Sequence, residues 1–166
     1  AEYLTYPSPQ GSGTMRGYYA RPANAGGKLP GVVVIHENRG LNPYIEDVAR
    51  RLAVLNFAAF APDALTPLGG YPGDEEKAAM LYRQLDAGKR TEDMGASVGQ
   101  LKSRPECSGK IGAVGFCAGG TAVNMLAVRI PDLAASVPFY GSPPAAAEVA
   151  RIKAPLMIPY AALDDR

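Results

Sequence analysis

Several residue types are scarce in this chain of 166 residues, and each scarcity excludes a class of protein. Two cysteines, Cys107 and Cys117, are too few for the disulfide framework of a small secreted domain. The longest apolar stretches fall far short of the roughly 20 residues that a membrane-spanning helix needs. A net charge of +1 supports neither nucleic-acid binding nor docking on an anionic membrane. The one histidine, His36, and the scattered carboxylates show no metal-ligand spacing, so we expect neither metal nor organic cofactor.

The rest of the composition is that of an ordinary globular protein. Hydrophobic residues make up 47% of the chain and charged residues 20%, which excludes disordered and fibrous classes. This length suits one folded unit, so we expect a single domain over residues 1–166. No signal-peptide pattern opens the sequence, and a mature exported protein would look the same. The expected location is the cytoplasm. Because the sequence starts at Ala1 without methionine, a periplasmic protein whose signal has been removed is the alternative.

Short apolar runs alternate along the chain with stretches of helical spacing. The β-branched run at residues 32–35 is typical of a strand buried on both faces of a parallel sheet. The sequence therefore predicts an α/β fold, with a mostly parallel sheet and helices on both faces. Strands are expected at residues 2–6, 15–20, 32–35, 57–60, 110–116, 134–140 and 156–160. Helices are expected behind the N-cap pair Asn42-Pro43, at residues 74–85, from Thr91 onward, at 117–129 and at 148–152.

The strongest motif is the stretch G-F-C-A-G-G at residues 115–120, between a predicted strand and a predicted helix. It is the nucleophile-elbow pattern G-x-S-x-G with Cys117 in the place of the serine. Glycines on both sides of the cysteine remove Cβ clashes at a sharp turn, and a helix N-terminus favours a thiolate. The amide of Ala118 is then positioned to hold an oxyanion. The alternative interpretation is a buried structural cysteine at a glycine-rich turn.

Together with this elbow, two further stretches make the chain resemble the dienelactone hydrolase family. They are V-I-H-E-N-R-G at residues 34–40 and Y-A-A-L-D at residues 160–164. A-P-D at residues 61–63 and P-F-Y-G at residues 138–141 also match the family's habits, so the resemblance runs from about residue 2 to the end. It implies an α/β-hydrolase fold and a cysteine enzyme that opens a lactone, such as carboxymethylenebutenolide, or an ester through a thioester intermediate.

The resemblance also implies a role for each matched residue. Cys117 would be the nucleophile, and Asp164 would orient the catalytic histidine. Glu37 would contact the resting thiol and help to generate the thiolate. The backbone amides of Asn38 and Ala118 would form the oxyanion hole.

Substrate binding is assigned on the same basis to Arg39, Tyr82 and Tyr140. The basic residue that helps to hold the substrate's carboxylate in well-known members has no clear match, because Ala78 falls near its position. The dienelactone substrate is therefore not carried over with the fold.

Other interpretations of these residues stay open. Glu37 could pair with Arg39 or cap a loop, and Arg39 could form a structural ion pair. Asp165 could take the place of Asp164 as the orienting acid. Cys107 is expected to be an ordinary loop or surface thiol.

The catalytic base is missing from this sequence. In α/β-hydrolases the histidine follows the acid, and no histidine follows Asp164. His36 ends a predicted strand, where a histidine typically shapes the loop, so we do not expect it to act as the base. Either the histidine lies on polypeptide outside these residues, or the protein is an inactive member.

The unfinished sheet favours the first explanation. A doubly wound sheet covers its last strand with a helix, and no helical pattern follows residues 156–160. An inactive enzyme would lose a side chain, whereas loss of a final helix and strand exposes apolar surface and an unpaired edge. We therefore expect an N-terminal fragment of a larger hydrolase, with a separate C-terminal fragment of the same protein supplying the histidine. The rival hypothesis is an inactive member of the fold that binds small molecules or partners.

Overall fold

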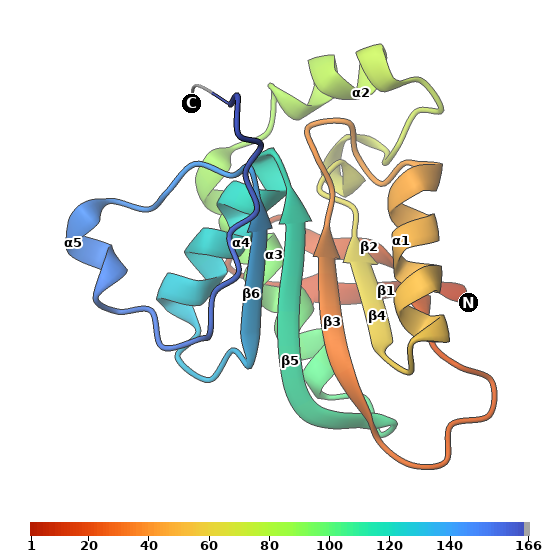
Figure 1. Ribbon diagram of the computed structural model, residues 1–166. Coiled ribbons are helices and arrows are strands. Elements are labelled where there is room, and N and C mark those ends of the chain that lie inside the picture. Colours follow the sequence, from red (N-terminus) through yellow and green to blue (C-terminus); the bar gives the residue numbers. More distant parts are fainter. Residues whose placement is uncertain (165–166) are drawn as a thin grey trace.

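A six-stranded mixed sheet with helices on both sides forms the centre of the computed structural model, which describes residues 1–164 (Figure 1). The strands are β1 (Glu2–Ser8), β2 (Gly13–Ala20), β3 (Leu29–Ile35), β4 (Ala58–Pro62), β5 (Cys107–Phe116) and β6 (Ala135–Phe139). The helices are α1 (Pro43–Val54), α2 (Glu75–Tyr82), α3 (Ala87–Lys102), α4 (Ala118–Arg129) and α5 (Ala146–Val149), with a short 3₁₀ turn, η1 (Thr66–Leu68). The predicted α/β class is confirmed.

The strand order is β1-β2-β4-β3-β5-β6. The pairs β4–β3, β3–β5 and β5–β6 are parallel, and only the two pairs made by β2 are antiparallel. The carboxyl ends of the parallel strands therefore meet at one edge of the sheet, where α2 also lies (Figure 1). This is the edge at which ligands bind in open α/β sheets.

Helices cover the two faces of the sheet unequally. Helix α1 packs on one face, whereas α3 and α4 pack on the other (Figure 1). All five residues of β4 are buried, and Val33 and Val34 of β3 are fully buried on opposite faces. In β5 the burial alternates instead: Ile111 and Ala113 are buried towards α3 and α4, while Val114 on the other face is only half-buried.

Local chemistry explains where the helices begin. The Asn42 side chain accepts a hydrogen bond from the amide of Ile45 at 3.1 Å, so α1 starts as predicted. Helix α3 starts earlier than predicted, because Asp86 caps it through the amide of Lys89 at 2.8 Å. The expected start at Thr91 is wrong, since Thr91 lies inside the helix and its hydroxyl donates to the backbone carbonyl of Ala87.

Two further expectations differ from the structure. Residues 156–160 lie extended beside β6 but form only a bridge, between Leu156 and Ser136, and no regular strand. Cys107, expected in a loop or at the surface, is buried at the start of β5 in the main hydrophobic core. No helix within residues 1–164 is long and apolar enough to cross a membrane.

The turn from β5 into α4 depends on glycine at a close approach. A Cβ atom on Gly119 would clash with the carbonyl oxygens of Ile35 and His36, the second of them 2.6 Å away. A Cβ atom on Gly120 would clash with the carbonyl oxygen of Phe139. The first turn of α4 therefore lies directly against the ends of β3 and β6, and no side chain fits between them.

We expect Gly119→Ala to lower the free energy of unfolding by about 1–3 kcal/mol, because the carbonyls of β3 must move to admit the methyl group. Gly99→Ala is the matched control, since Gly99 lies exposed in α3 with open space around it. That change should stabilise the protein by about 0.5–1 kcal/mol. Urea unfolding of the two variants checks the prediction, and equal midpoints would contradict it.

Candidate active site

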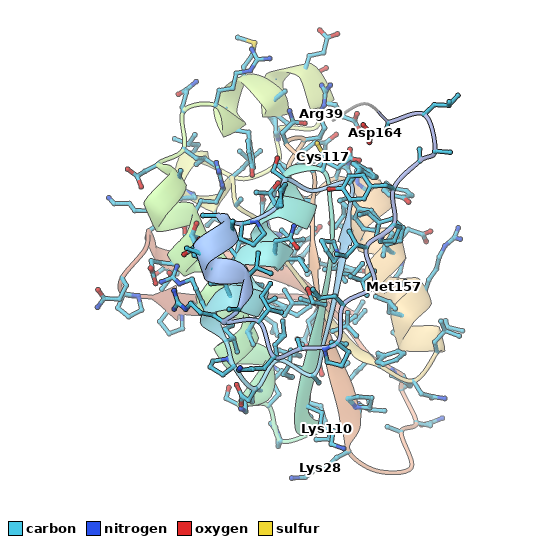
Figure 2. The ribbon with its side chains drawn as sticks, turned by 60° about the vertical axis from the view of Figure 1, so that its left-hand side comes forward. Lys28, Arg39, Lys110, Cys117, Met157 and Asp164 are labelled. Atoms are coloured by element: carbon cyan, nitrogen blue, oxygen red, sulfur yellow. The ribbon has the colours of Figure 1, made fainter. Side chains whose placement is uncertain are left out.

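Cys117 lies at the tip of the turn between β5 and α4, at the carboxyl edge of the parallel strands (Figure 2). Its backbone has φ 57° and ψ −115°, a conformation that side-chain-bearing residues rarely adopt. Its amide donates to the carbonyl of Phe139 at 3.1 Å, and its carbonyl accepts from the amide of Thr121 at 3.0 Å. These bonds fix the strained residue between β6 and the first turn of α4. The half-buried thiol is therefore held in place at the carboxyl ends of the parallel strands.

Glu37 and Tyr140 face each other beside this thiol. The Tyr140 hydroxyl donates to Oε1 of Glu37 at 2.7 Å. Burial, this hydrogen bond and the nearby negative charges of Glu37 and a Cys117 thiolate all raise the pKa of Tyr140. Tyr140 therefore stays protonated and remains a donor. The structure brings together all three of these predicted site residues.

Arg39 bonds to the start of α2 and forms no ion pair with Glu37 within residues 1–164. Its guanidinium donates to the carbonyl oxygen of Glu75 at 3.2 Å, at the start of α2. The Glu75 side chain in turn accepts a hydrogen bond from the side-chain nitrogen, Nδ2, of Asn42 at 3.0 Å. Arg39 thus links the loop after β3 to the helix that lies over the strand ends (Figure 1).

Tyr82, the last residue of α2, approaches the site from above the strand ends. Its ring meets the ring of His36 edge to face, with centroids 6.1 Å apart, and the Arg90 guanidinium lies 4.6 Å from its centre. Burial raises the pKa of Tyr82, the positive charge of Arg90 lowers it, and charge on Cys117 raises it. The interaction with Cys117 places Tyr82 within electrostatic range of the thiol.

His36 is a structural residue in this fold. Its side chain is 1% exposed, and Nε2 accepts a hydrogen bond from the amide of Ala64 at 3.0 Å. Nδ1 therefore carries the hydrogen and donates it to the carbonyl of Glu37. Burial lowers the pKa of His36, although the negative charge of Asp63 opposes this. Because backbone groups occupy both ring nitrogens, His36 has no nitrogen left for Cys117.

Asp63 organises the same loops, a role that the sequence analysis missed. Its two carboxylate oxygens accept from the amides of Leu65 and Tyr71, at 3.0 and 3.1 Å. Oδ1 lies 3.9 Å from Nε2 of His36. An aspartate directly after a buried strand, ahead of a glycine-rich loop, is the signal that could have revealed it.

The predicted oxyanion-hole residues lie on neighbouring segments. Ala118 is the first residue of α4, where amides have no partner within the helix. Asn38 follows β3 in the loop that begins at His36, and the elbow packs against the start of this loop through Gly119. The backbone amides of both residues thus lie at the carboxyl ends of the parallel strands, where Cys117 also lies.

Asp164 lies at the same end of the molecule as Cys117 and Arg39 (Figure 2). The segment before it is anchored to β6, because the amide of Tyr140 donates to the carbonyl of Pro159 at 3.1 Å. The Tyr160 hydroxyl also donates to the carbonyl of Gly141. Asp164 is half-buried and its amide closes a turn on Ala161. The alternative acid, Asp165, lies outside the described residues.

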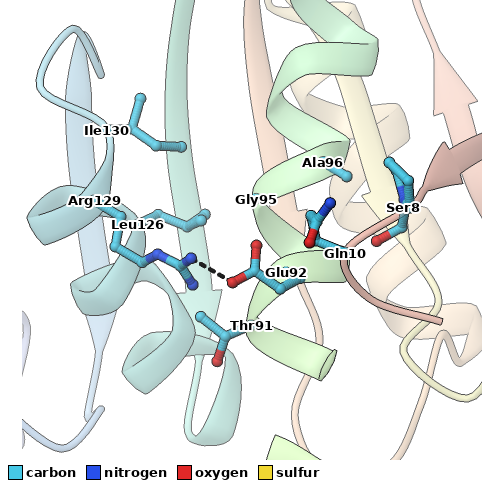
Figure 3. A pocket seen from close by; sticks show the side chains of 10 residues that line it. Ser8, Gln10, Thr91, Glu92, Gly95, Ala96, Leu126, Arg129 and Ile130 are labelled. Carbon is cyan, nitrogen blue, oxygen red and sulfur yellow. Dashed lines mark hydrogen bonds and ion pairs between the residues drawn. The ribbon is translucent and has the colours of Figure 1, made fainter. Parts of the chain in front are cut away.

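Two other observations limit the search for a site. Within residues 1–164 no group of three His, Cys, Asp or Glu side chains is placed to hold a metal ion. A hollow of about 300 Å³ lies between α3 and α4, crossed by the ion pair of Arg129 and Glu92 (Figure 3). Because Arg129 ends α4 and Cys117 precedes it, this hollow lies at the far end of that helix from the thiol.

Comparisons with known proteins bear on the same residues. The model of the dienelactone hydrolase family matches residues 15–166. "Putative hydrolase fragment YghX" of Escherichia coli K12 is 60% identical over 86 residues, which are 52% of this chain and 74% of that protein. "Putative carboxymethylenebutenolidase" of Aquifex aeolicus is 37% identical over 138 residues, which cover 78% of this chain and 57% of that protein.

The fold agrees with these matches. The crystal structure of a "Putative Dienelactone Hydrolase" from Klebsiella pneumoniae superposes with a TM-score of 0.75 at 28% identity. The superposition covers 95% of this chain and 71% of that one. This chain spans about half the length of most of the curated relatives it matches. The family match covers nearly all of the sequence, and the chain belongs to the dienelactone hydrolase family.

Proposed function

We propose that this chain carries the nucleophile of an ester or lactone hydrolase, and that Cys117 forms a thioester with the acyl group of the substrate. The observation that carries this proposal is the strained backbone of Cys117 at a strand-to-helix turn, beside the bonded pair of Glu37 and Tyr140. A structural cysteine needs no such strain and is normally buried among apolar side chains, as Cys107 is.

In the first step the Cys117 sulfur attacks the carbonyl carbon of the substrate. The carbonyl oxygen becomes an oxyanion, which the amides of Asn38 and Ala118 stabilise. The bond from this carbon to the alcohol oxygen then breaks, and the alcohol leaves with a proton. Water attacks the resulting thioester, which releases the acid and restores the thiol.

Glu37 is the proton acceptor of the resting thiol in this proposal. Its carboxylate accepts the thiol proton and so generates the thiolate, while the Tyr140 hydroxyl holds the carboxylate in place at 2.7 Å. Since His36 is occupied by backbone, the base of the later steps is an imidazole that these residues do not include. Asp164 orients that imidazole.

Tyr82, Arg39 and Tyr140 surround the position of the substrate. Tyr82 closes it from the α2 side, and Arg39 offers a guanidinium at the rim. Ala78, near the position where the family resemblance implies a basic residue, is buried in α2 and offers no charge. We therefore propose an ester or lactone substrate without assigning dienelactone itself.

An inactive binding module is the second candidate. It is favoured by one observation, the occupation of both nitrogens of His36, which leaves no imidazole for Cys117 within residues 1–164. The state of the thiol separates the two candidates, because a binding module has no use for an activated cysteine.

We expect iodoacetamide at neutral pH to alkylate Cys117 at least about tenfold faster than a cysteine in an unfolded peptide, as activated thiols do. Cys107 is buried and should remain unlabelled until the protein is denatured. Peptide mapping by mass spectrometry follows both sites, and the Cys117→Ser protein is the control. A rate equal to that of the unfolded peptide would favour the binding module.

We expect Glu37→Gln to slow this alkylation about tenfold, because the thiol loses its proton acceptor. Coulomb repulsion alone predicts the opposite sign, since removal of a negative charge would favour the thiolate. The matched control is Glu46→Gln, which removes the charge of a carboxylate that likewise accepts a hydrogen bond from a tyrosine, Tyr3, in the first turn of α1. That variant should react at the wild-type rate. Faster alkylation of the Glu37 variant would rule out the proton-acceptor role.

A further inference from the structure

We propose that the hollow between α3 and α4 is a second binding site, which takes a small uncharged molecule with an apolar body and a hydroxyl group. The hollow has a volume of about 300 Å³ and is bordered by the turn that joins β1 to β2. It lies at the far end of α4 from Cys117. This site is therefore separate from the proposed active site and does not depend on its chemistry.

A buried hydroxyl without a partner faces this hollow. The Ser8 side chain is fully buried, and its Oγ has no hydrogen-bond partner among residues 1–164. Ser8 shares a face of β1 with Tyr6, whose hydroxyl donates to the carbonyl of Asp93 in α3. Figure 3 shows the Ser8 hydroxyl turned the same way, towards α3 and the hollow. A buried hydroxyl is unfavourable unless it is bonded, so a ligand that bonds to Oγ would remove this cost.

Apolar side chains form the walls beside this hydroxyl. They are Ala96 of α3 and Leu126 and Ile130 at the end of α4 (Figure 3). Small-molecule sites have this composition, in which a few polar groups fix the orientation of a ligand among apolar ones. A cavity of roughly 150 Å³ already holds benzene. The hollow therefore has room for one six-membered ring with its substituents.

A glycine inside α3 keeps part of this space open. Gly95 lies in the interior of the helix, where glycine is one of the least favourable residues. A Cβ atom on Gly95 would have no other atom within 4 Å, so the packing of the described residues does not require glycine there. Because Gly95 lines the hollow, a side chain at this position would occupy part of it.

The charges around the hollow favour an uncharged ligand. The two charged residues of the lining, Glu92 and Arg129, form an ion pair across it, with side chains 36% and 39% exposed. An anion would be repelled by Glu92 and a cation by Arg129, whereas an uncharged molecule leaves the pair intact. Since the Ser8 hydroxyl can donate and accept, the hydroxyl of an alcohol or a phenol can bond to it in either role.

Phenol is the probe for this site. Benzene is the matched molecule without a hydroxyl, and benzoate is the charged one. In a titration followed by amide NMR, phenol should shift the signals of residues 8–10, 91–96 and 126–130. The expected dissociation constant is about 1–10 mM, as is usual for so small a ligand. Benzene should bind about three- to tenfold more weakly, because it leaves Oγ without a partner. Benzoate should bind at least about tenfold more weakly than phenol.

Two variants test the residues named above. Ser8→Ala should lower the affinity for phenol to that for benzene without lowering the unfolding midpoint, because the deleted hydroxyl has no partner among residues 1–164. Gly95→Leu should fill the hollow and abolish the shifts. The matched control is Gly99→Leu, one turn further along α3 and outside the lining, which should bind phenol as the wild type does. Leucine is a better helix former than glycine, so both of these variants should fold.

Three results would overturn the proposal. They are equal affinity for phenol and benzene, undiminished binding of phenol to either test variant, and the lack of a saturable shift around the hollow. None of these measurements uses the thiol of Cys117. Their outcome is therefore independent of the alkylation experiments that test the proposed function.

Discussion

The close approach of α4 to the ends of β3 and β6 is the contact on which the rest of the edge depends. Gly119 lies against the carbonyls of Ile35 and His36, and Gly120 lies against Phe139. This contact forces Cys117 into its strained conformation and aims the first amides of α4 towards the loop after β3. Without it neither the thiol nor the amide of Ala118 would share a site with Asn38. The geometry of the elbow is therefore set by backbone packing, and side chains refine it.

A neutral imidazole holds the other half of the edge together. His36 donates from Nδ1 to the backbone carbonyl of Glu37 and accepts at Nε2 from the loop after β4. Protonation would replace this acceptor by a donor facing the amide of Ala64. Burial also lowers the pKa of His36, although the negative charge of Asp63 and the hydrogen bond to the carbonyl of Glu37 oppose this. A residue type that usually performs acid–base chemistry is thus committed to structure, which leaves the proton chemistry to other groups.

Local patterns predicted the parts of the molecule that depend on local chemistry. The elbow at residues 115–120 and the cap at Asn42 could be recognised because turn and capping preferences act within a few residues. The bond between Tyr140 and Glu37 could not be predicted from spacing, because it joins residues 103 positions apart across β5. Cys107 was misplaced for the same reason, since its polar neighbours suggest a loop while pairing with Leu29 of β3 buries it.

Strand β5 contributes residues both to the candidate site and to the uncovered face of the sheet. Residues of β5 that point to α4 support the elbow, and the alternate residues, such as Val114, form the uncovered surface. Both sets of residues belong to the strand that leads into Cys117. A change in packing on either face of β5 would therefore also shift the turn that holds the nucleophile candidate, because neighbouring residues of one strand cannot move independently.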